Sequence, residues 1–208
     1  MRVVDVVQGF LGSGKTTLID HLIREVFTKE KILVLQTEWG DFQLPDYGSR
    51  VKVCSWDWEK GFPPVEMQKL ICTPGVQRVI IEVNGMSPGQ KLLETLEILR
   101  AKGEISLGAS LAVFHGPTWQ TMGKPLEELF RSMALTSHGF WIREGTVDLH
   151  RWIMNVQPKG CLTSGDEWSA WYRHVIRSTR LKGLAKIAWT AGIIMAMYLF
   201  YWLLFGKI

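Results

Sequence analysis

Residues 9–17 carry the side chains whose types and spacing point most directly to chemistry. They read Gly-Phe-Leu-Gly-Ser-Gly-Lys-Thr-Thr and satisfy G-x-x-x-x-G-K-S/T, a pattern that binds phosphate. Its glycines let the backbone turn tightly and aim several N–H groups at phosphate oxygens. Lys15 can reach the β- and γ-phosphates, and the Thr16 hydroxyl can coordinate Mg²⁺. The pattern predicts a site for a nucleoside triphosphate, GTP or ATP, with Mg²⁺.

A loop of this kind needs a strand before it and a helix after it. Residues 3–7 read Val-Val-Asp-Val-Val, a short β-branched run typical of a buried strand. Residues 17–27 carry apolar side chains three and four positions apart, which is typical of an amphipathic helix. The positive end of the helix dipole would then face the phosphates. We interpret residues 9–17 as a P-loop; the alternative is a glycine-rich turn that binds nothing.

Short apolar runs alternate with helical patterns through the first 160 residues. Further strands are predicted at 31–36, 50–54, 77–85, 106–114 and 139–142. Further helices are predicted at 65–72, 90–102, 126–135 and 149–156. This alternation is typical of α/β proteins. We therefore predict a P-loop NTPase domain over residues 1–160, with a mostly parallel sheet flanked by helices.

One acidic residue follows a run of buried strand residues. Glu82 comes directly after Val79-Ile80-Ile81, where an unpaired carboxylate would be costly, so a polar or metal-binding role is favoured. In P-loop proteins an acid at this place handles Mg²⁺ directly or through water. Glu82 is therefore a predicted Mg²⁺ residue and, with Lys15, a predicted catalytic residue.

The composition changes after residue 160. From 168 to 186 the chain has basic residues and no acidic one, and residues 187–205 carry no charge. A helix over 187–205 would be roughly 28 Å long, close to the thickness of a bilayer core. We predict a basic juxtamembrane segment at 161–186 and a single transmembrane helix at 187–205, with membrane lipid as a partner. The preceding Lys and Arg residues predict that the nucleotide domain lies on the cytoplasmic side. A buried or oligomer-contact helix is the alternative.

The charge and the cysteines narrow the class of protein. The net charge is only +4, and the basic residues form no long run, so we do not predict nucleic-acid binding. The three cysteines are widely spaced and odd in number. They are typical of a reducing compartment and do not indicate a disulfide framework.

Three segments together resemble the CobW-like GTPases, relatives of the UreG and HypB metallochaperones. Residues 9–19 resemble the P-loop of that family. Thr37-Glu38-Trp39-Gly40 stands where the family has Asn-Glu-Phe-Gly, and Glu82-Val83-Asn84-Gly85, followed by Pro88, stands where it has Glu-Thr-Ser-Gly and a proline. The resemblance covers about residues 1–160. It implies that Glu38 takes part in the Mg²⁺ and switch region and that Gly85 offers its N–H to the γ-phosphate.

The predicted site residues follow from the loop pattern and this resemblance. Those that bind the nucleotide are Gly9, Gly12, Ser13, Gly14, Lys15, Thr16, Thr17 and Gly85. Those that hold Mg²⁺ are Thr16, Glu38 and Glu82. Those that assist hydrolysis are Lys15, Glu82 and Glu38.

Two motifs of the family are missing from this chain. Its metal-binding Cys-x-Cys-Cys is reduced to Cys54, and its guanine-reading Asn-Lys-x-Asp is replaced by Ile142-Arg143-Glu144-Gly145. The leading hypothesis is a membrane-anchored protein that binds GTP or ATP and hydrolyses it slowly with Mg²⁺. The alternatives are a non-catalytic, nucleotide-dependent switch or scaffold that recruits a membrane protein, a metal-delivery factor, and a P-loop kinase.

Overall fold

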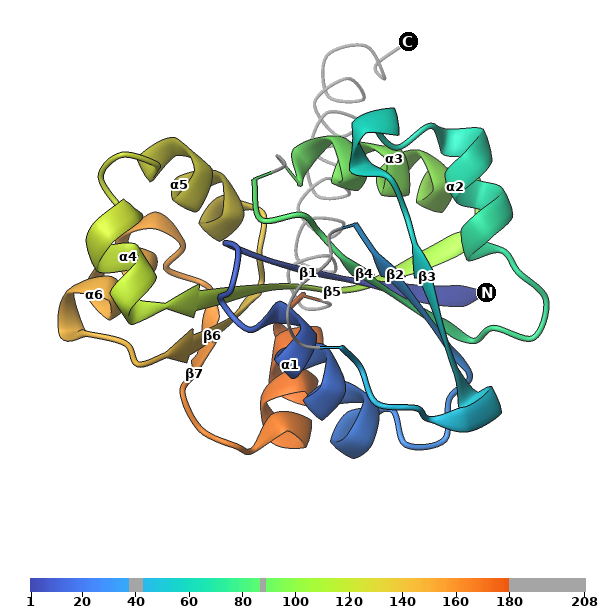
Figure 1. Ribbon diagram of the computed structural model, residues 1–208, viewed down its shortest axis with the longest axis horizontal. Coiled ribbons are helices and arrows are strands. Elements are labelled where there is room, and N and C mark those ends of the chain that lie inside the picture. The colour runs from blue at the N-terminus through green and yellow to red at the C-terminus, as the bar shows by residue number, and fades with distance from the viewer. Residues whose placement is uncertain (38–42, 87–88, 180–208) are drawn as a thin grey trace, which may run out of the picture. The chain divides into compact units, whose positions relative to one another are not determined.

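The computed structural model describes residues 1–37, 43–86 and 89–179 (Figure 1). The chain divides into two compact units, Met1–Val175 and Ile176–Ile208. Of the second unit, only residues 176–179 are described, and they are helical. The predicted transmembrane segment at 187–205 therefore lies outside the described residues. Within the described ranges, no helix is both long and apolar enough to cross a membrane.

The described residues of the first unit form a seven-stranded sheet in the order β3-β2-β4-β1-β5-β6-β7. Every neighbouring pair in this sheet is parallel. The strands are β1 (Arg2–Gly9), β2 (Ile32–Gln36), β3 (Val51–Ser55), β4 (Arg78–Glu82), β5 (Ile105–His115), β6 (Gly139–Arg143) and β7 (Cys161–Thr163). The central strands are buried on both faces, which explains their continuous apolar runs.

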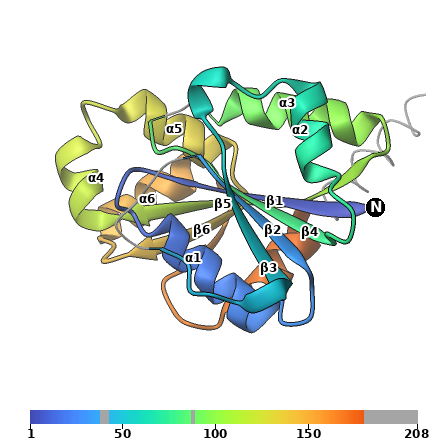
Figure 2. The same cartoon turned by 45° about the vertical axis from the view of Figure 1, so that its right-hand side comes forward.

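Helices cover both faces of the sheet, as Figures 1 and 2 show from two sides. The α-helices are α1 (Lys15–His21), α2 (Pro64–Ile71), α3 (Gln90–Ala101), α4 (Gly116–Met122), α5 (Glu127–Leu135) and α6 (Val147–Val156). A π-helical turn, Leu22–Val26, continues α1. Helices α2 and α3 pack on one face over β1, β2 and β4, while α1 lies on the opposite face. The predicted α/β fold with a parallel sheet flanked by helices is confirmed.

Helix α4 and strand β7 are among the short elements that were not predicted from the sequence. Helix α4 begins with Gly116-Pro117, a pair typical of turns, and it has only seven residues. Strand β7 has three residues, too few for any periodicity to appear. Both elements extend the half of the domain built on β5 and β6.

The first unit also extends beyond the predicted boundary at residue 160. Residues 168–175 are helical and bury Trp168, Trp171 and Tyr172 within this unit. The Trp168 ring stacks on His21 of α1 with 4.6 Å between ring centroids. It meets Trp141 of β6 edge-on at 5.0 Å. Because these aromatic side chains are buried, residues 161–175 are part of the domain rather than a segment separate from it.

Candidate functional site

The P-loop connects β1 to α1 at the carboxyl edge of the sheet. Gly12 and Gly14 have φ angles of 71° and 103°, a left-handed conformation that favours glycine. The Ser13 N–H donates to the Phe10 carbonyl at 3.1 Å, and the Leu18 N–H donates to the Gly14 carbonyl at 3.0 Å. These bonds close the loop on itself and begin the helix directly behind it.

Lys15 is held over this loop. Its side chain is largely withdrawn from solvent, and the residue is only 3% exposed. The ammonium nitrogen Nζ donates to the carbonyls of Gly9, at 3.1 Å, and Phe10, at 3.3 Å. The positive charge therefore lies beside the loop backbone, where the pattern predicts the β- and γ-phosphates.

Thr16 and Glu82 meet directly, although they are far apart in the sequence. The Thr16 hydroxyl donates to Glu82 Oε1 at 2.6 Å, and Gln36 Nε2 donates to Glu82 Oε2 at 2.8 Å. The parallel register explains this meeting, because β4 pairs with both neighbours so that Glu82 lies opposite Val7 and Gln36. Hydroxyl and carboxylate oxygens are hard ligands of the kind that Mg²⁺ binds. The donor set therefore fits the predicted Mg²⁺.

The segments after β2 and β4 are joined at the same edge. The Thr37 hydroxyl donates to the Glu82 carbonyl at 3.0 Å, and the Asn84 N–H donates to that hydroxyl at 2.6 Å. Gly85 then lies on the P-loop, where a Cβ would be 2.5 Å from the Leu11 nitrogen. A side chain at residue 85 would displace the loop, so the two backbones approach closely only because this residue is glycine.

Arg143 is a site residue that sequence reasoning did not assign. It ends β6, and its Nη1 donates to the Ser13 carbonyl at 3.1 Å. Its guanidinium carbon lies 5.4 Å from the centre of the Trp141 ring. A Cβ on Gly14 would be 2.6 Å from Nη1, so the guanidinium packs directly on the P-loop. The signal in the sequence was the replacement at 142–145, where Arg143 stands among the residues that replace the guanine-reading motif.

The remaining predictions have different outcomes. Glu38 lies outside the described residues, so its predicted role in the Mg²⁺ region stays a prediction. Cys54 is half-buried in β3. Within residues 1–37, 43–86 and 89–179, no group of three or more His, Cys, Asp or Glu side chains is arranged to hold a metal ion.

The geometry defines an α/β protein with the P-loop NTPase fold. Residues 3–47 match the family model described as CobW/HypB/UreG, nucleotide-binding domain. In this segment the chain carries the signature of that family, and the predicted resemblance to the CobW-like P-loop GTPases is confirmed. No curated protein matches the chain.

Solved structures share the fold at low sequence identity. The Zn(II)-bound YjiA GTPase from E. coli is 18% identical with a TM-score of 0.59, over 78% of this chain and 57% of YjiA. Hydrogenase maturation factor HypB from Archaeoglobus fulgidus is 15% identical with a TM-score of 0.56, over 88% of this chain and 90% of HypB. FtsY from Elizabethkingia anophelis in complex with GDP is 14% identical with a TM-score of 0.52, over 85% of this chain and 64% of FtsY. The chain thus spans little more than half the length of YjiA.

Proposed function

We propose that this protein binds a nucleoside triphosphate, GTP or ATP, together with Mg²⁺ at residues 9–17 and hydrolyses it slowly. The observation that carries this proposal is the 2.6 Å hydrogen bond between the Thr16 hydroxyl and the Glu82 carboxylate. It brings a P-loop hydroxyl and a strand-end acid to one point beside Lys15. These three groups are the ones that a Mg²⁺–triphosphate requires from the protein.

Each residue has a definite task in this proposal. Lys15 neutralises charge on the β- and γ-phosphates, and Thr16 and Glu82 hold Mg²⁺, which stabilises the charge that develops during phosphoryl transfer to water. Gln36 fixes the Glu82 carboxylate through its 2.8 Å hydrogen bond. Gly85, which packs on the loop backbone, would offer its N–H to the γ-phosphate. Glu82 or Glu38 helps to place the metal or the attacking water.

A titration with fluorescent GTP and ATP analogues in the presence of Mg²⁺ tests the binding site. The experiment uses the full-length protein in detergent. Lys15→Ala should weaken binding by roughly 10- to 150-fold, because a charge-assisted contact to phosphate contributes about 1.5–3 kcal/mol. Lys29→Ala is the matched control, since Lys29 is exposed and should keep the affinity. Equal binding by the wild type and Lys15→Ala would overturn the proposal.

The same titration measures whether the site prefers a nucleotide with guanine or with adenine. Residues 142–145 have no Asp at the place where the family motif has the carboxylate that accepts the guanine N–H donors. Arg143 packs on the P-loop instead. Competition of unlabelled GTP and ATP against the bound analogue measures the preference directly, and a structure with the bound nucleotide would show which group meets the base.

We further propose that residues 187–205 anchor the protein in a membrane as a single span, with the nucleotide domain on the cytoplasmic side. The support is the uncharged run itself and the basic residues that precede it. In Triton X-114 phase partitioning, the full-length chain should enter the detergent phase and a chain that ends at residue 179 should stay in the aqueous phase. A full-length chain that stays in the aqueous phase would refute the proposed membrane anchor.

A second candidate is a switch or scaffold that binds nucleotide without hydrolysing it and recruits a membrane protein. The close packing of Gly85 on the P-loop favours it, because a γ-phosphate at the loop would contact this segment and could order it. Phosphate release at saturating Mg²⁺ separates the two candidates. Release that depends on Lys15 supports hydrolysis, whereas nucleotide binding without release supports the switch.

A further inference from the structure

Residues 168–175 lead the chain to the amino edge of the sheet, which is opposite the edge that carries the P-loop. Trp168 meets Trp141, the third residue of β6, edge-on at 5.0 Å. Further along the segment, Val175 lies against the first residue of the same strand, because a Cβ on Gly139 would be 2.7 Å from Val175 Cγ2. The segment therefore runs from the middle of β6 to its amino end, and the first unit ends there at Val175.

Three exposed lysines lie at this amino edge. Lys29 and Lys31 come just before β2, and Lys102 lies between the end of α3 and the start of β5. In the sheet order, β4 and β1 separate β2 from β5, so the starts of β2 and β5 are about 14 Å apart. The three lysines therefore belong to one surface, which we call the basic edge.

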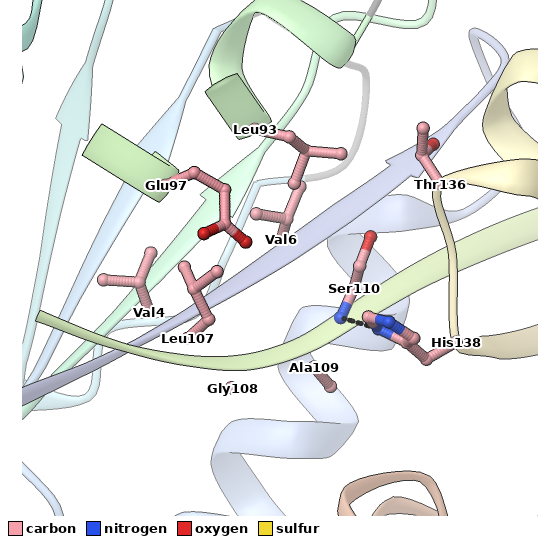
Figure 3. Close-up of a pocket in the computed structure, with 10 residues that line it drawn as sticks. All are labelled: Val4, Val6, Leu93, Glu97, Leu107, Gly108, Ala109, Ser110, Thr136 and His138. Carbon is pink, nitrogen blue, oxygen red and sulfur yellow. Dashed lines mark hydrogen bonds between the residues drawn. The ribbon is translucent and has the colours of Figure 1, made fainter. Parts of the chain in front are cut away.

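The acidic side chains next to these lysines already have partners. Glu30 pairs with the buried Arg78 at 2.6 Å, and Glu104 accepts a side-chain hydrogen bond at 2.7 Å. Glu97 pairs with Arg100 at 2.6 Å. Figure 3 shows the Glu97 carboxylate over β1 and β5, on the α3 face of the sheet rather than at its edge. The free charge at the basic edge is therefore mainly positive.

The carboxyl edge carries exposed acids instead. Glu59, Glu144 and Asp166 follow β3, β6 and β7 there, and a bound nucleoside triphosphate would add further negative charge. Strand β1 joins the two edges, and its eight residues span about 26 Å. This length is more than twice the Debye length of about 10 Å at 0.1 M salt. An anionic surface at the basic edge would therefore attract the lysines without repelling the nucleotide.

We infer that the basic edge lies against an anionic membrane surface and that the carboxyl edge, with its P-loop, faces away from it. The chain that follows Val175 supports this orientation. Residues 176–186 contain four basic residues and no acidic one, and they lead to the uncharged run at 187–205. Lysines close to anionic headgroups are attracted to them. The orientation rests on the proposed membrane anchor, whereas the charge of the basic edge does not.

Acetylation of lysines in the full-length protein tests the inference, with mass spectrometry to quantify each modified residue. The protein is placed in nanodiscs of phosphatidylcholine and in nanodiscs that also contain phosphatidylserine. Lys29, Lys31 and Lys102 should react about fivefold more slowly in the phosphatidylserine discs, the protection expected of a lysine held at an anionic surface. Lys60, after β3, and Lys91, at the start of α3, are exposed near the carboxyl edge and should react equally in both. High salt should remove the difference.

Two charge-reversal variants sharpen this test. Lys31→Glu/Lys102→Glu should remove the protection of Lys29, because the basic edge then loses its attraction to the anionic lipid. Lys60→Glu/Lys91→Glu changes the net charge by the same amount and should keep that protection. Unchanged reactivity of the wild-type Lys29, Lys31 and Lys102 between the two kinds of disc would overturn the inference. Protection of Lys60 and Lys91 would also overturn it, because the carboxyl edge would then face the membrane.

The neutral discs test the anchor separately from the basic edge. A full-length chain that does not enter phosphatidylcholine discs refutes the proposed anchor, and the acetylation is then repeated with phosphatidylserine vesicles. Protection of Lys29, Lys31 and Lys102 on these vesicles would uphold the basic edge as a surface that binds anionic lipid, and its absence would overturn it. Neither result depends on nucleotide binding, so the proposed nucleotide site is judged by its own titration.

Discussion

Asp5 and Glu82 are buried acids on the neighbouring strands β1 and β4, and their surroundings differ in kind. Asp5 is fully buried away from the carboxyl ends of the strands, and it contacts Arg78, the Tyr172 hydroxyl at 2.7 Å and the Ala109 N–H at 2.6 Å. Glu82 ends its strand and accepts hydrogen bonds from Thr16 of the P-loop and from Gln36. The first acid joins parts of the fold, and the second lies at the carboxyl edge of the sheet, against the P-loop.

The cluster around Asp5 joins the helical residues 168–175 to the sheet. Arg78 lies 4.0 Å from the centre of the Phe27 ring and donates to Glu30 at 2.6 Å and to the Tyr172 hydroxyl at 3.0 Å. Burial alone would lower the pKa of Arg78, but the negative charge of Asp5 raises it above its ordinary value. Burial and the charge of Asp5 also raise the pKa of Tyr172. The buried Asp5 carboxylate, with a cation and a hydroxyl in contact with it, therefore serves to hold parts of the fold together.

The largest expected effect is on stability, from Arg78→Met. Removing the cation leaves the Asp5 carboxylate buried without its charge partner, so the free energy of unfolding should fall by about 3–5 kcal/mol. Urea unfolding followed by tryptophan fluorescence measures it. The double variant Asp5→Asn/Arg78→Met should recover part of the loss, because the uncompensated charge is then absent. A single-variant loss below about 1 kcal/mol would show that the ion pair does not stabilise the fold.

Glu82→Gln should lower nucleotide affinity more than stability, the reverse of what is expected for Arg78→Met. Loss of the carboxylate charge should weaken Mg²⁺-dependent nucleotide affinity by roughly 10–100-fold. The amide can still accept from Thr16 through its oxygen, so the free energy of unfolding should change less than in Arg78→Met. Nucleotide titrations with and without Mg²⁺ measure the first effect. If Glu82→Gln binds Mg²⁺–nucleotide as the wild type does, Glu82 is not a metal residue.

Gly85→Ala should disturb the carboxyl edge of the sheet only because the added methyl group collides with the P-loop. The added Cβ would meet the Leu11 nitrogen at 2.5 Å, and overpacking costs about 1–3 kcal/mol. Nucleotide affinity should fall about tenfold. Gly165→Ala is the matched control, since a Cβ at residue 165 meets nothing within 4 Å. Equal affinities for the two variants would mean that residue 85 and the loop move freely past each other.

The smallest effect is expected from Tyr172→Phe, about 1 kcal/mol for the lost hydrogen bond to Asp5. Because the pKa of Tyr172 is raised in the folded protein, the unfolded chain loses this proton near pH 10 while the folded protein keeps it. The contribution is therefore complete below about pH 10 and decreases as the pH rises above it. Urea unfolding between pH 8 and pH 11 should show the wild type losing its advantage over Tyr172→Phe. A constant difference across this range would contradict the raised pKa.

Local patterns carried the prediction of the fold and of most of the site. The β-branched run before Gly9 and the helical spacing after Thr17 are properties of consecutive residues, and the position of Glu82 at a strand end follows from the same kind of pattern. Contacts between distant residues left no such signal. Arg143 meets Ser13 across 130 positions, and Tyr172 meets Asp5 across 167, so neither partner could be chosen from spacing.

The sequence by itself determined the parallel α/β architecture, the P-loop and the resemblance to the CobW-like GTPases. Each of these depends on short-range periodicity or on a contiguous motif. The tertiary structure decided that Thr16 meets Glu82, that Arg143 packs on the loop, and that residues 161–175 complete the domain. It also decided that the Ala109 N–H reaches the Asp5 carboxylate, since that contact depends on a one-residue shift between β1 and β5. Strand order and register set these meetings, and both arise from packing of the whole chain.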